Sequence, residues 1–268
     1  EEQVTSAKSH TDSPVTHHHS TGSLNISDEV IATLKLGITD KKDTEVHEYF
    51  FKHQIYHTAS TRERLALIEA VSDALLHDKQ YRRCVALLAP LAESQRLASA
   101  SQFNYALSLS RMQAYEQAVE AYQDLVRAQP GHQSGHINLG LLLNKLTHYE
   151  DARPTLKAAI KISAGSKKAK AYSALASAEW KLGELKRAER YFKLAIDYRP
   201  DHAATWLKLA EVQRALDVAE SEVTLTYQRA LALRPDYARA WHKLGQYYLQ
   251  TLRFANSVDA LHRALKYS

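Results

Sequence analysis

Histidine is the residue type in this chain that most invites a metal site, because fourteen are present among 268 residues. His53 and His57 are spaced i, i+4, which places them on one face of a helix at a spacing that can bind Zn²⁺ or Ni²⁺. No third ligand is evident except Glu45 or His47 nearby. The run of histidines at 17–19 stands in a polar segment where only adventitious binding is expected. We therefore interpret these histidines as surface residues and predict no metal.

Catalytic motifs are missing from the sequence, which has no Gly-rich phosphate loop, no GxSxG, no HExxH and no paired-carboxylate motif. Cys84 is the only cysteine, so an intrachain disulfide and a cysteine-based zinc site are both excluded. Cys84 stands at position 20 of a repeat described below, where the other copies carry a small residue. We therefore expect it to pack in the core rather than act as a nucleophile. The sequence predicts a non-enzymatic protein without a cofactor.

The charge is unevenly distributed along the chain. Residues 1–98 carry 11 Lys and Arg against 14 Asp and Glu, a net of −3, whereas residues 99–268 carry 24 against 16, a net of +8. An electrostatic preference for acidic partners should therefore belong to the C-terminal part. The cations form no dense stripe, so we predict a protein partner and no nucleic acid, although Trp180 or Tyr248 could stack on bases.

The N-terminal segment has a different composition from the rest. Residues 1–26 are rich in Ser, Thr and His with little apolar content, so we expect a disordered leader. Residues 27–64 are expected to form a helical extension or a degenerate repeat, which is left open. No apolar run approaches the roughly 18–20 residues that span a bilayer, so no transmembrane segment is predicted.

A repeat dominates the chain from residue 65. "AIDYRPDHAATWLKLA" (195–210) and "ALALRPDYARAWHKLG" (230–245) share eight of sixteen positions. Windows in one register can be drawn at 65–98, 99–132, 133–166, 169–202, 203–237 and 238–268. Position 8 of each window is small, and position 24 is large. The small residues are Ser72, Ala106, Gly140, Ala176, Ala210 and Gly245, and the large ones are Leu88, Tyr122, Leu156, Phe192, Tyr227 and Leu261.

This pattern predicts two antiparallel helices in each window. Apolar positions 4, 7, 8 and 11 follow helical spacing, and positions 20, 24 and 27 do so again after a turn. Small residues allow the two helices to approach closely, and large ones fill the space between them. Pro130, Pro200 and Pro235 end three of the windows, since proline cannot continue a helix. Each pair leaves one face bare until the next pair covers it, so the pairs should stack.

The windows resemble tetratricopeptide repeats, which are 34-residue helix–turn–helix units. "WLKLAEVQ" (206–213) and "WHKLGQYY" (241–248) resemble the signature of the first helix, and "AERYFKLAIDYRPD" (188–201) that of the second. The resemblance covers about six repeats over residues 65–268. It implies an all-α, right-handed superhelix that acts as an interaction scaffold.

In this family, first-helix positions 2, 5, 9, 12 and 13 line the concave face that binds partners. Carried over to this sequence, with position 6 included, they predict a groove of cations beside apolar side chains. The predicted groove residues are Phe103, Leu107, Arg111, Asn138, Leu141, Lys145, Lys170, Trp180, Lys181, Leu207, Arg214, Arg239 and His242. Such a groove suits an extended peptide with acidic and apolar residues. The alternative is that these cations are solvated surface charges.

Two known variants of the family's groove fit only in part. The dicarboxylate clamp for chaperone tails needs five residues, of which only Asn138 and Lys170 are in place, so we reject it. An asparagine ladder at position 6 begins with Asn104 and Asn138, but Lys208 and Lys243 stand at the later positions. Backbone binding near the two asparagines is one interpretation, and bridging between neighbouring helices is the other.

The function predicted is a scaffold that binds a protein or peptide in a partly basic concave groove, for instance in a bacterial envelope assembly machine. The absence of a start methionine and the polar leader slightly favour a periplasmic or membrane-tethered location over a cytoplasmic one. The alternative is the substrate-recruiting portion of a glycosyl- or sulfotransferase. A third expectation concerns the last pair, which lacks a covering helix in this sequence. Val258, Leu261 and Leu265 are then partly exposed, covered by self-association through that end, or covered by further sequence, and these three interpretations are left open.

Overall fold

The structure, a computed structural model, describes residues 61–93 and 97–268. The chain divides into two compact units, residues 1–67 and 68–268. Of the first unit only residues 61–67, the beginning of α4, are described. The predicted leader at 1–26, the extension up to residue 60 and the histidine pair His53/His57 lie outside the described residues.

Within those two ranges the chain forms twelve α-helices and no strand, as the sequence predicts. The helices are α4 (Thr61–His77), α5 (Tyr81–Glu93), α6 (Ser99–Arg111), α7 (Tyr115–Ala128), α8 (Gln133–Lys145), α9 (Tyr149–Ile162), α10 (Gly165–Lys181), α11 (Leu185–Tyr198), α12 (Ala203–Ala215), α13 (Glu220–Leu233), α14 (Ala238–Gln250) and α15 (Phe254–Lys266).

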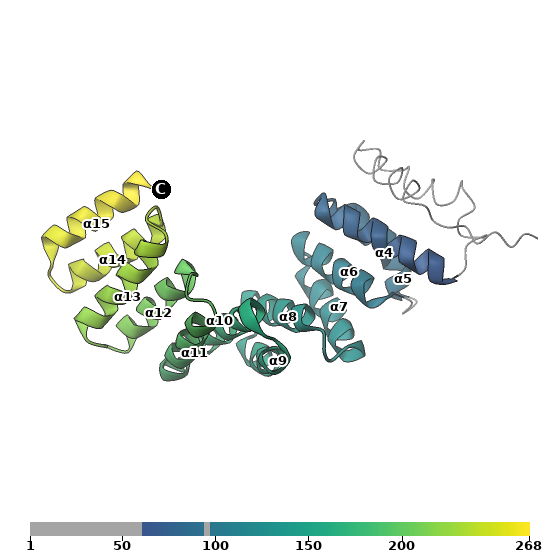
Figure 1. Cartoon of the computed structure of the whole chain (residues 1–268), viewed down its shortest axis with the longest axis horizontal. Coiled ribbons are helices and arrows are strands. Elements are labelled where there is room, and N and C mark those ends of the chain that lie inside the picture. The colour runs from purple at the N-terminus through teal and green to yellow at the C-terminus, as the bar shows by residue number, and fades with distance from the viewer. Residues whose placement is uncertain (1–60, 94–96) are drawn as a thin grey trace, which may run out of the picture. The chain divides into compact units, whose positions relative to one another are not determined.

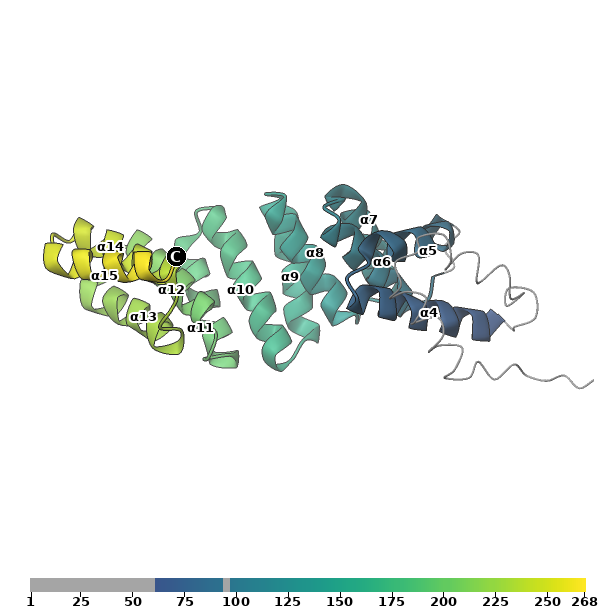
Figure 2. The ribbon, with the colours of Figure 1, turned by 90° about the horizontal axis from the view of Figure 1, so that it is seen from above.

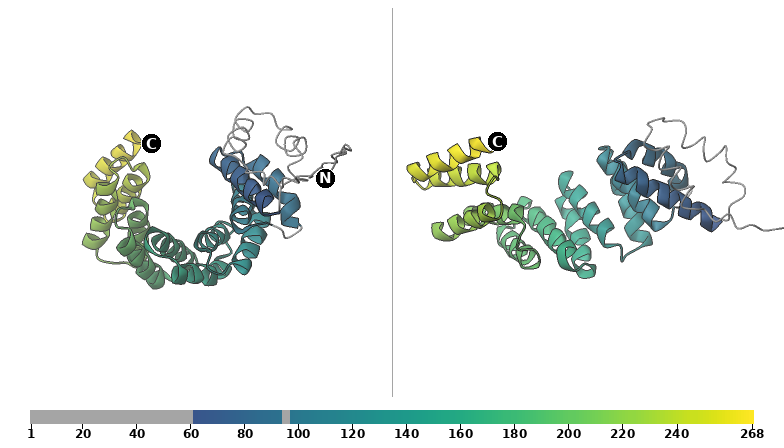
Figure 3. Two further views of the ribbon diagram at one scale, coloured as in Figure 1. Left: turned by 45° about the vertical axis from the view of Figure 1, so that its right-hand side comes forward. Right: turned by 45° about the horizontal axis from the view of Figure 1, so that its top comes forward.

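The helices of residues 68–268 form consecutive pairs, and the pairs follow one another in sequence order (Figures 1 and 2). In each pair from α6/α7 to α14/α15, the even-numbered helix is the first and the odd-numbered helix the second. The second helix of a pair also packs against the first helix of the next, as α9 does on α10 and α11 on α12. First helices touch one another as well, α6 contacting α8 and α8 contacting α10. The result is an all-α solenoid (Figure 3).

Close approach of the two helices in a pair depends on the small residue at position 8, as predicted. A Cβ atom built on Gly140 of α8 would lie 2.4 Å from Leu156 of α9. One built on Gly245 of α14 would lie 2.7 Å from Leu261 of α15. Both distances are shorter than non-bonded carbon atoms tolerate, so the large residue at position 24 occupies the space that a side chain at position 8 would need.

The turn between the two helices of every pair has one residue in the left-handed region. These residues are Lys79, Gln113, Thr147, Gly183, Asp217 and Leu252, with φ between 55° and 82°. All six stand at position 15 of their windows. Only Gly183 has the residue type that adopts this conformation without steric cost. The turn is therefore imposed by the packing of the two helices rather than by its own residue.

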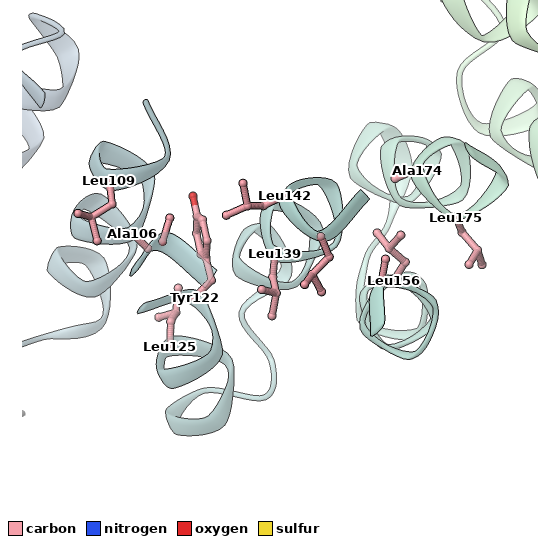
Figure 4. Packing of buried hydrophobic residues seen from close by; sticks show 12 residues of the cluster. Ala106, Leu109, Tyr122, Leu125, Leu139, Leu142, Leu156, Ala174 and Leu175 are labelled. Carbon is pink, nitrogen blue, oxygen red and sulfur yellow. The ribbon is translucent and has the colours of Figure 1, made fainter. Parts of the chain in front are cut away.

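The core runs between the pairs as well as within them. Figure 4 shows Tyr122 of α7 beside Ala106 and Leu109 of α6 and near Leu142 of α8. Tyr122 is fully buried. Burial raises the pKa of its hydroxyl to about 12, although the hydrogen bond from Asn138 opposes the shift. Each helix pair is therefore stabilised by the next.

Cys84 of α5 is fully buried, which confirms its predicted place in the core. Burial raises the pKa of its thiol, so the neutral form is favoured. A protonated, inaccessible thiol is a poor nucleophile.

None of the described helices combines the length and apolar character needed to cross a membrane.

Candidate functional site

A cavity of about 600 Å³ opens between three successive first helices, α8, α10 and α12, with α11 closing one side. We call it the α10 cavity, because α10 contributes the most residues. The lining residues are Leu141, Asn144, Lys145, Ala169, Lys170, Ser173, Ala174, Ser177, Ala195, Arg199, His202, Thr205 and Lys208. They include three lysines and an arginine but no carboxylate, so the lining favours anions.

Lys170 provides the least neutralised of these charges. It lies in the second turn of α10 with its side chain partly within the cavity, and the described residues give it no hydrogen-bond or ion-pair partner. Desolvation in the cavity and, second, the charge of Arg111 lower the pKa of its ammonium group. Both effects would be offset by an anion bound beside it.

Lys208 reaches into the cavity from α12. Its Nζ donates to Ser177 Oγ at 3.0 Å, and Ser177 Oγ in turn donates to the Ser173 carbonyl at 2.8 Å. Burial and, second, Arg239 lower the pKa of Lys208, while Glu211 opposes the shift. Glu211 is itself 3.3 Å from Lys243, so its charge is shared between two lysines. The ammonium of Lys208 is held in place without being fully compensated.

The remaining cations are engaged at the cavity's edges. Lys145 donates to the hydroxyl of Tyr115 and lies over its ring, 4.1 Å from the centroid. Arg199 pairs with the exposed Asp201 at 3.4 Å. His202 Nδ1 is hydrogen-bonded to Thr205 Oγ1 at 2.7 Å. Lys145 is thus engaged by a hydroxyl and a ring, and no carboxylate of the described residues pairs with it.

Asn144 gives the cavity a hydrogen-bond acceptor. Its Nδ2 donates to the Ala174 carbonyl at 2.8 Å, which fixes the orientation of the amide. Oδ1 is shielded from solvent and has no partner in the described part of the chain. A buried acceptor without a partner costs free energy, so a donor on a bound molecule would stabilise it.

Of the thirteen predicted groove residues, the cavity brings together Leu141, Lys145 and Lys170. Three further predicted groove residues, Arg111, Arg239 and His242, are exposed on α6 and α14 but do not line it. The cavity residue most clearly absent from the prediction is Lys208. Its signal was available, because Lys208 occupies position 6, where a peptide-binding asparagine was considered.

Other predicted residues serve the fold. Phe103 and Leu107 pack on the core around Tyr122, and Trp180 packs on the core around Phe192. Lys181 lies over the ring of Trp180, 5.9 Å from its centroid.

Arg214 donates to Gln250 Oε1 at 3.4 Å. Leu207 is only 2% exposed, so it is a core residue and its side chain is not presented to a partner. It belongs to a buried cluster that also contains residues of α13 and α14.

The two asparagines considered as a ladder bridge helices, which agrees with the second interpretation. Asn104 is buried, and its Nδ2 donates to Ser72 Oγ at 3.0 Å and Asp73 Oδ1 at 2.6 Å in α4. Asn138 donates to the Tyr122 hydroxyl at 3.2 Å. Their amide groups are thus used within the protein.

No cluster of three or more metal-ligating side chains occurs within residues 61–93 and 97–268.

Comparison with known proteins points to one family. Tetratricopeptide repeat models match residues 103–167 and 169–202. No curated protein matches the sequence. Among solved structures, the C-terminal part of a repeat-containing protein from Cytophaga hutchinsonii is 14% identical with a TM-score of 0.65, over 89% of this chain and 95% of that chain.

Two further structures share the fold. MamA from Desulfovibrio magneticus RS-1 is 18% identical, with a TM-score of 0.58 over 65% of this chain and 96% of that chain. YrrB, described as a tetratricopeptide repeat protein with an unusual peptide-binding site, is 15% identical, with a TM-score of 0.53 over 68% and 92%. The family matches and the solenoid of helix pairs agree with the sequence signatures, so residues 103–167 and 169–202 of this chain are tetratricopeptide repeats.

Proposed function

We propose that this protein is a scaffold whose α10 cavity binds an acidic segment of a partner protein. Tetratricopeptide repeats are typically non-catalytic interaction modules, which supports a binding role in general. The observation that carries the specific proposal is the lining of the cavity. Lys145, Lys170 and Lys208 from three helices and Arg199 from the turn after α11 all line it, and no carboxylate is among the lining residues.

The cavity also has the shape and mixed chemistry of a peptide site. The side chain of Leu141 and the alanines of α10 provide apolar surface between the cations. Peptide sites combine such surface with a few placed polar groups that fix orientation. YrrB, which shares the fold, is described as having a peptide-binding site, and this supports the same use of the repeats here.

Charge reversal tests the proposal. The Lys170→Glu/Lys208→Glu variant should lose at least tenfold in affinity for an Asp- and Glu-rich peptide, measured by fluorescence anisotropy at about 0.1 M salt, where charges within about 10 Å still interact. Lys181→Glu/Lys186→Glu is the matched control. It makes the same total change of charge, but both residues are exposed and lie outside the cavity, so it should retain most of the affinity. Equal losses in the two variants would reject the cavity as the site.

The partner that the sequence favours belongs to a bacterial envelope assembly machine. In the alternative role, the chain recruits a substrate for a transferase, and the same cavity would bind that substrate. Crosslinking of the full chain in its host, followed by mass spectrometry of the captured partners, separates the two roles. A transferase attached to or captured by the chain would favour recruitment.

We also propose that the protein self-associates through the outer face of α15. Phe254, Val258 and Leu265 are 59%, 68% and 74% exposed and lie along one side of that helix. Their combined exposure is unusual for a solvated surface, since it forms a continuous apolar stripe. Light scattering over a range of concentrations should show a rising mass, and Val258→Asp/Leu265→Asp should remove the rise. A constant monomer mass at high concentration would reject this proposal.

A further inference from the structure

Glu179 of α10 is a buried carboxylate that does not line the α10 cavity. Its side chain is 1% exposed. Glu179 follows Lys170 by about two and a half turns at 3.6 residues per turn, so the two residues lie on opposite sides of the helix. Lys170 faces the cavity, and Glu179 therefore marks the back of α10.

Two arginines from different helices converge on one oxygen of this carboxylate. Arg153 of α9 places its Nη2 atom 3.0 Å from Glu179 Oε2, and Arg187 of α11 places its Nη1 atom 4.0 Å from the same oxygen. Each arginine also meets a carboxylate of its own segment, Arg153 that of Glu150 at 3.1 Å and Arg187 that of Glu184 at 3.7 Å. Acidic and basic residues thus alternate from α9 across α10 to the N-cap of α11. We call these five residues the α10 latch.

The repeat itself indicates that stability does not require a charge at this place. Glu179 stands at position 11 of its window, and the three preceding windows carry Leu75, Leu109 and Leu143 there, each at most 4% exposed. Removing a carboxylate from water is costly, and apolar replacement of a buried ion pair is often neutral or stabilising. A buried ion pair instead penalises every arrangement in which a charge loses its partner, so it can select one arrangement of the helices.

The arrangement of α10 decides where the cavity's polar groups lie. Lys170, Ser173 and Ser177 all line the cavity from this helix, and Ser177 Oγ accepts from Lys208 Nζ at 3.0 Å. Because the three side chains share one helix, a rotation of α10 about its axis would move them together. The latch joins the back of α10 to α9 and α11, the two helices that pack beside it.

We propose that Glu179 is a positioning residue for the α10 cavity. Together with Arg153 and Arg187 it fixes the orientation of α10 between α9 and α11, and it thereby places the cations of the cavity for the ligand. The consequence for binding rests on the proposed function, whereas the consequence for the helices does not.

The direct test measures the distance between α9 and α11 without a ligand. Lys157 of α9 and Arg190 of α11 are exposed, so cysteines placed there in the full chain can carry nitroxide labels, and buried Cys84 stays unlabelled. Pulsed electron paramagnetic resonance should give one narrow distance distribution for this labelled parent.

Removal of the latch should widen that distribution. In the Arg153→Met/Glu179→Leu/Arg187→Met variant we expect at least a twofold increase in width. The urea midpoint should be unchanged or higher, because no buried charge is left without a partner. Asp124→Met/Arg127→Met is the matched control, since it removes a 2.8 Å ion pair within α7 and should leave the distribution as it is. Glu179→Gln keeps the shape of the side chain without its charge, so it should widen the distribution as well and serves if the triple variant does not fold.

A binding measurement then connects the latch to the cavity. The triple variant retains Lys170 and Lys208, yet it should lose at least fivefold in affinity for the Asp- and Glu-rich peptide by fluorescence anisotropy. An unchanged distance distribution in both latch variants would overturn the proposal. A wider distribution with undiminished affinity would show that the latch orients the helices but does not position the cavity. If the parent itself binds no acidic peptide, the proposed function fails, and the distances alone decide whether the latch fixes α10.

Discussion

The inner helix pairs and the last helix pair differ in how far they bury the residue at one equivalent position of the repeat. Ile196 of α11 and Leu231 of α13 are 8% and 6% exposed, because α12 and α14 pack over them. Leu265 of α15, at the same position of the repeat, is 74% exposed. The residue type is alike in all three, so burial is decided by the neighbouring pair and not by the residue. The α10 cavity also depends on neighbouring pairs, because three successive first helices, α8, α10 and α12, line it.

The largest effect expected from this comparison is on the free energy of unfolding. Ile196→Asp should destabilise the protein by about 3 kcal/mol, because an unpaired carboxylate would be buried between α11 and α12. Leu265→Asp should change the stability by less than about 0.5 kcal/mol, because the added charge remains in water. Urea unfolding followed by circular dichroism measures both. Similar losses in the two variants would show that α15 is covered in solution.

The glycines at position 8 give the next effect. Gly140→Ala should destabilise by about 2 kcal/mol, because overpacking against Leu156 costs about 3 kcal/mol and exceeds the gain of about 1 kcal/mol in helix propensity. Gly245→Ala should destabilise less than Gly140→Ala. The half-buried side chain of Leu261 can move outward, whereas its backbone nitrogen, 3.3 Å from the added Cβ, cannot. The same urea titrations report both variants. Gly131→Ala is the control, since a Cβ atom there meets nothing within 4 Å. A neutral Gly140→Ala would contradict the close approach of α8 and α9.

The left-handed turns test whether the pairs are stabilised locally. Thr147 and Leu252 have φ of 65° and 60°. Glycine at either position removes a steric cost of about 1–2 kcal/mol, partly offset by its greater freedom in the unfolded chain. For each variant we expect the free energy of unfolding to rise by about 0.5–1 kcal/mol. Hydrogen exchange should show the gain of Thr147→Gly spread over the interior helices and that of Leu252→Gly confined to α14 and α15. Uniform protection throughout by both variants would mean that the array unfolds as one unit.

The smallest effect expected is on the pH dependence of the free energy of unfolding. His132 Nδ1 accepts from the Gly135 N–H at 2.9 Å at the start of α8, and desolvation lowers its pKa. The unfolded state, with a histidine pKa of about 6.5, binds the proton more readily, so this stabilisation is complete above that pH and is lost as pH falls through the lower, folded pKa. His132→Asn should retain the cap and flatten the fall in stability between pH 7.5 and 5. His202 has a lowered pKa as well, so some slope should remain. An unchanged slope would assign the dependence to other groups.

The sequence predicted the elements and their pairing because the governing interactions are local or repeat at a fixed interval. Gly140 and Gly245 could be identified as contact points, since position 8 is small in every window and position 24 is large. Cys84 could be placed in the core for the same reason. The left-handed residue at position 15 could not be identified, because four of the six residues there, Lys79, Gln113, Thr147 and Leu252, are of types that do not favour that conformation.

The site was predicted only in part. Lys170 follows from the repeat register alone, as an exposed residue at position 2. Leu207 was assigned to the groove by the same register but is buried. Lys208 was omitted, although it reaches Ser177 at 3.0 Å. The register gives the direction of a side chain on its own helix, but it does not give the residues that face it from the next pair.

By itself, the sequence determined that the chain is an array of helix pairs, since hydrophobic spacing and small residues fix which faces pack. Only the tertiary structure decided which charges meet. The offset between neighbouring first helices brings Asn144, at position 12, to Ala174, at position 6, and Lys208 to Ser177. That offset arises from the packing of many side chains across three pairs, so no single stretch of sequence encodes it.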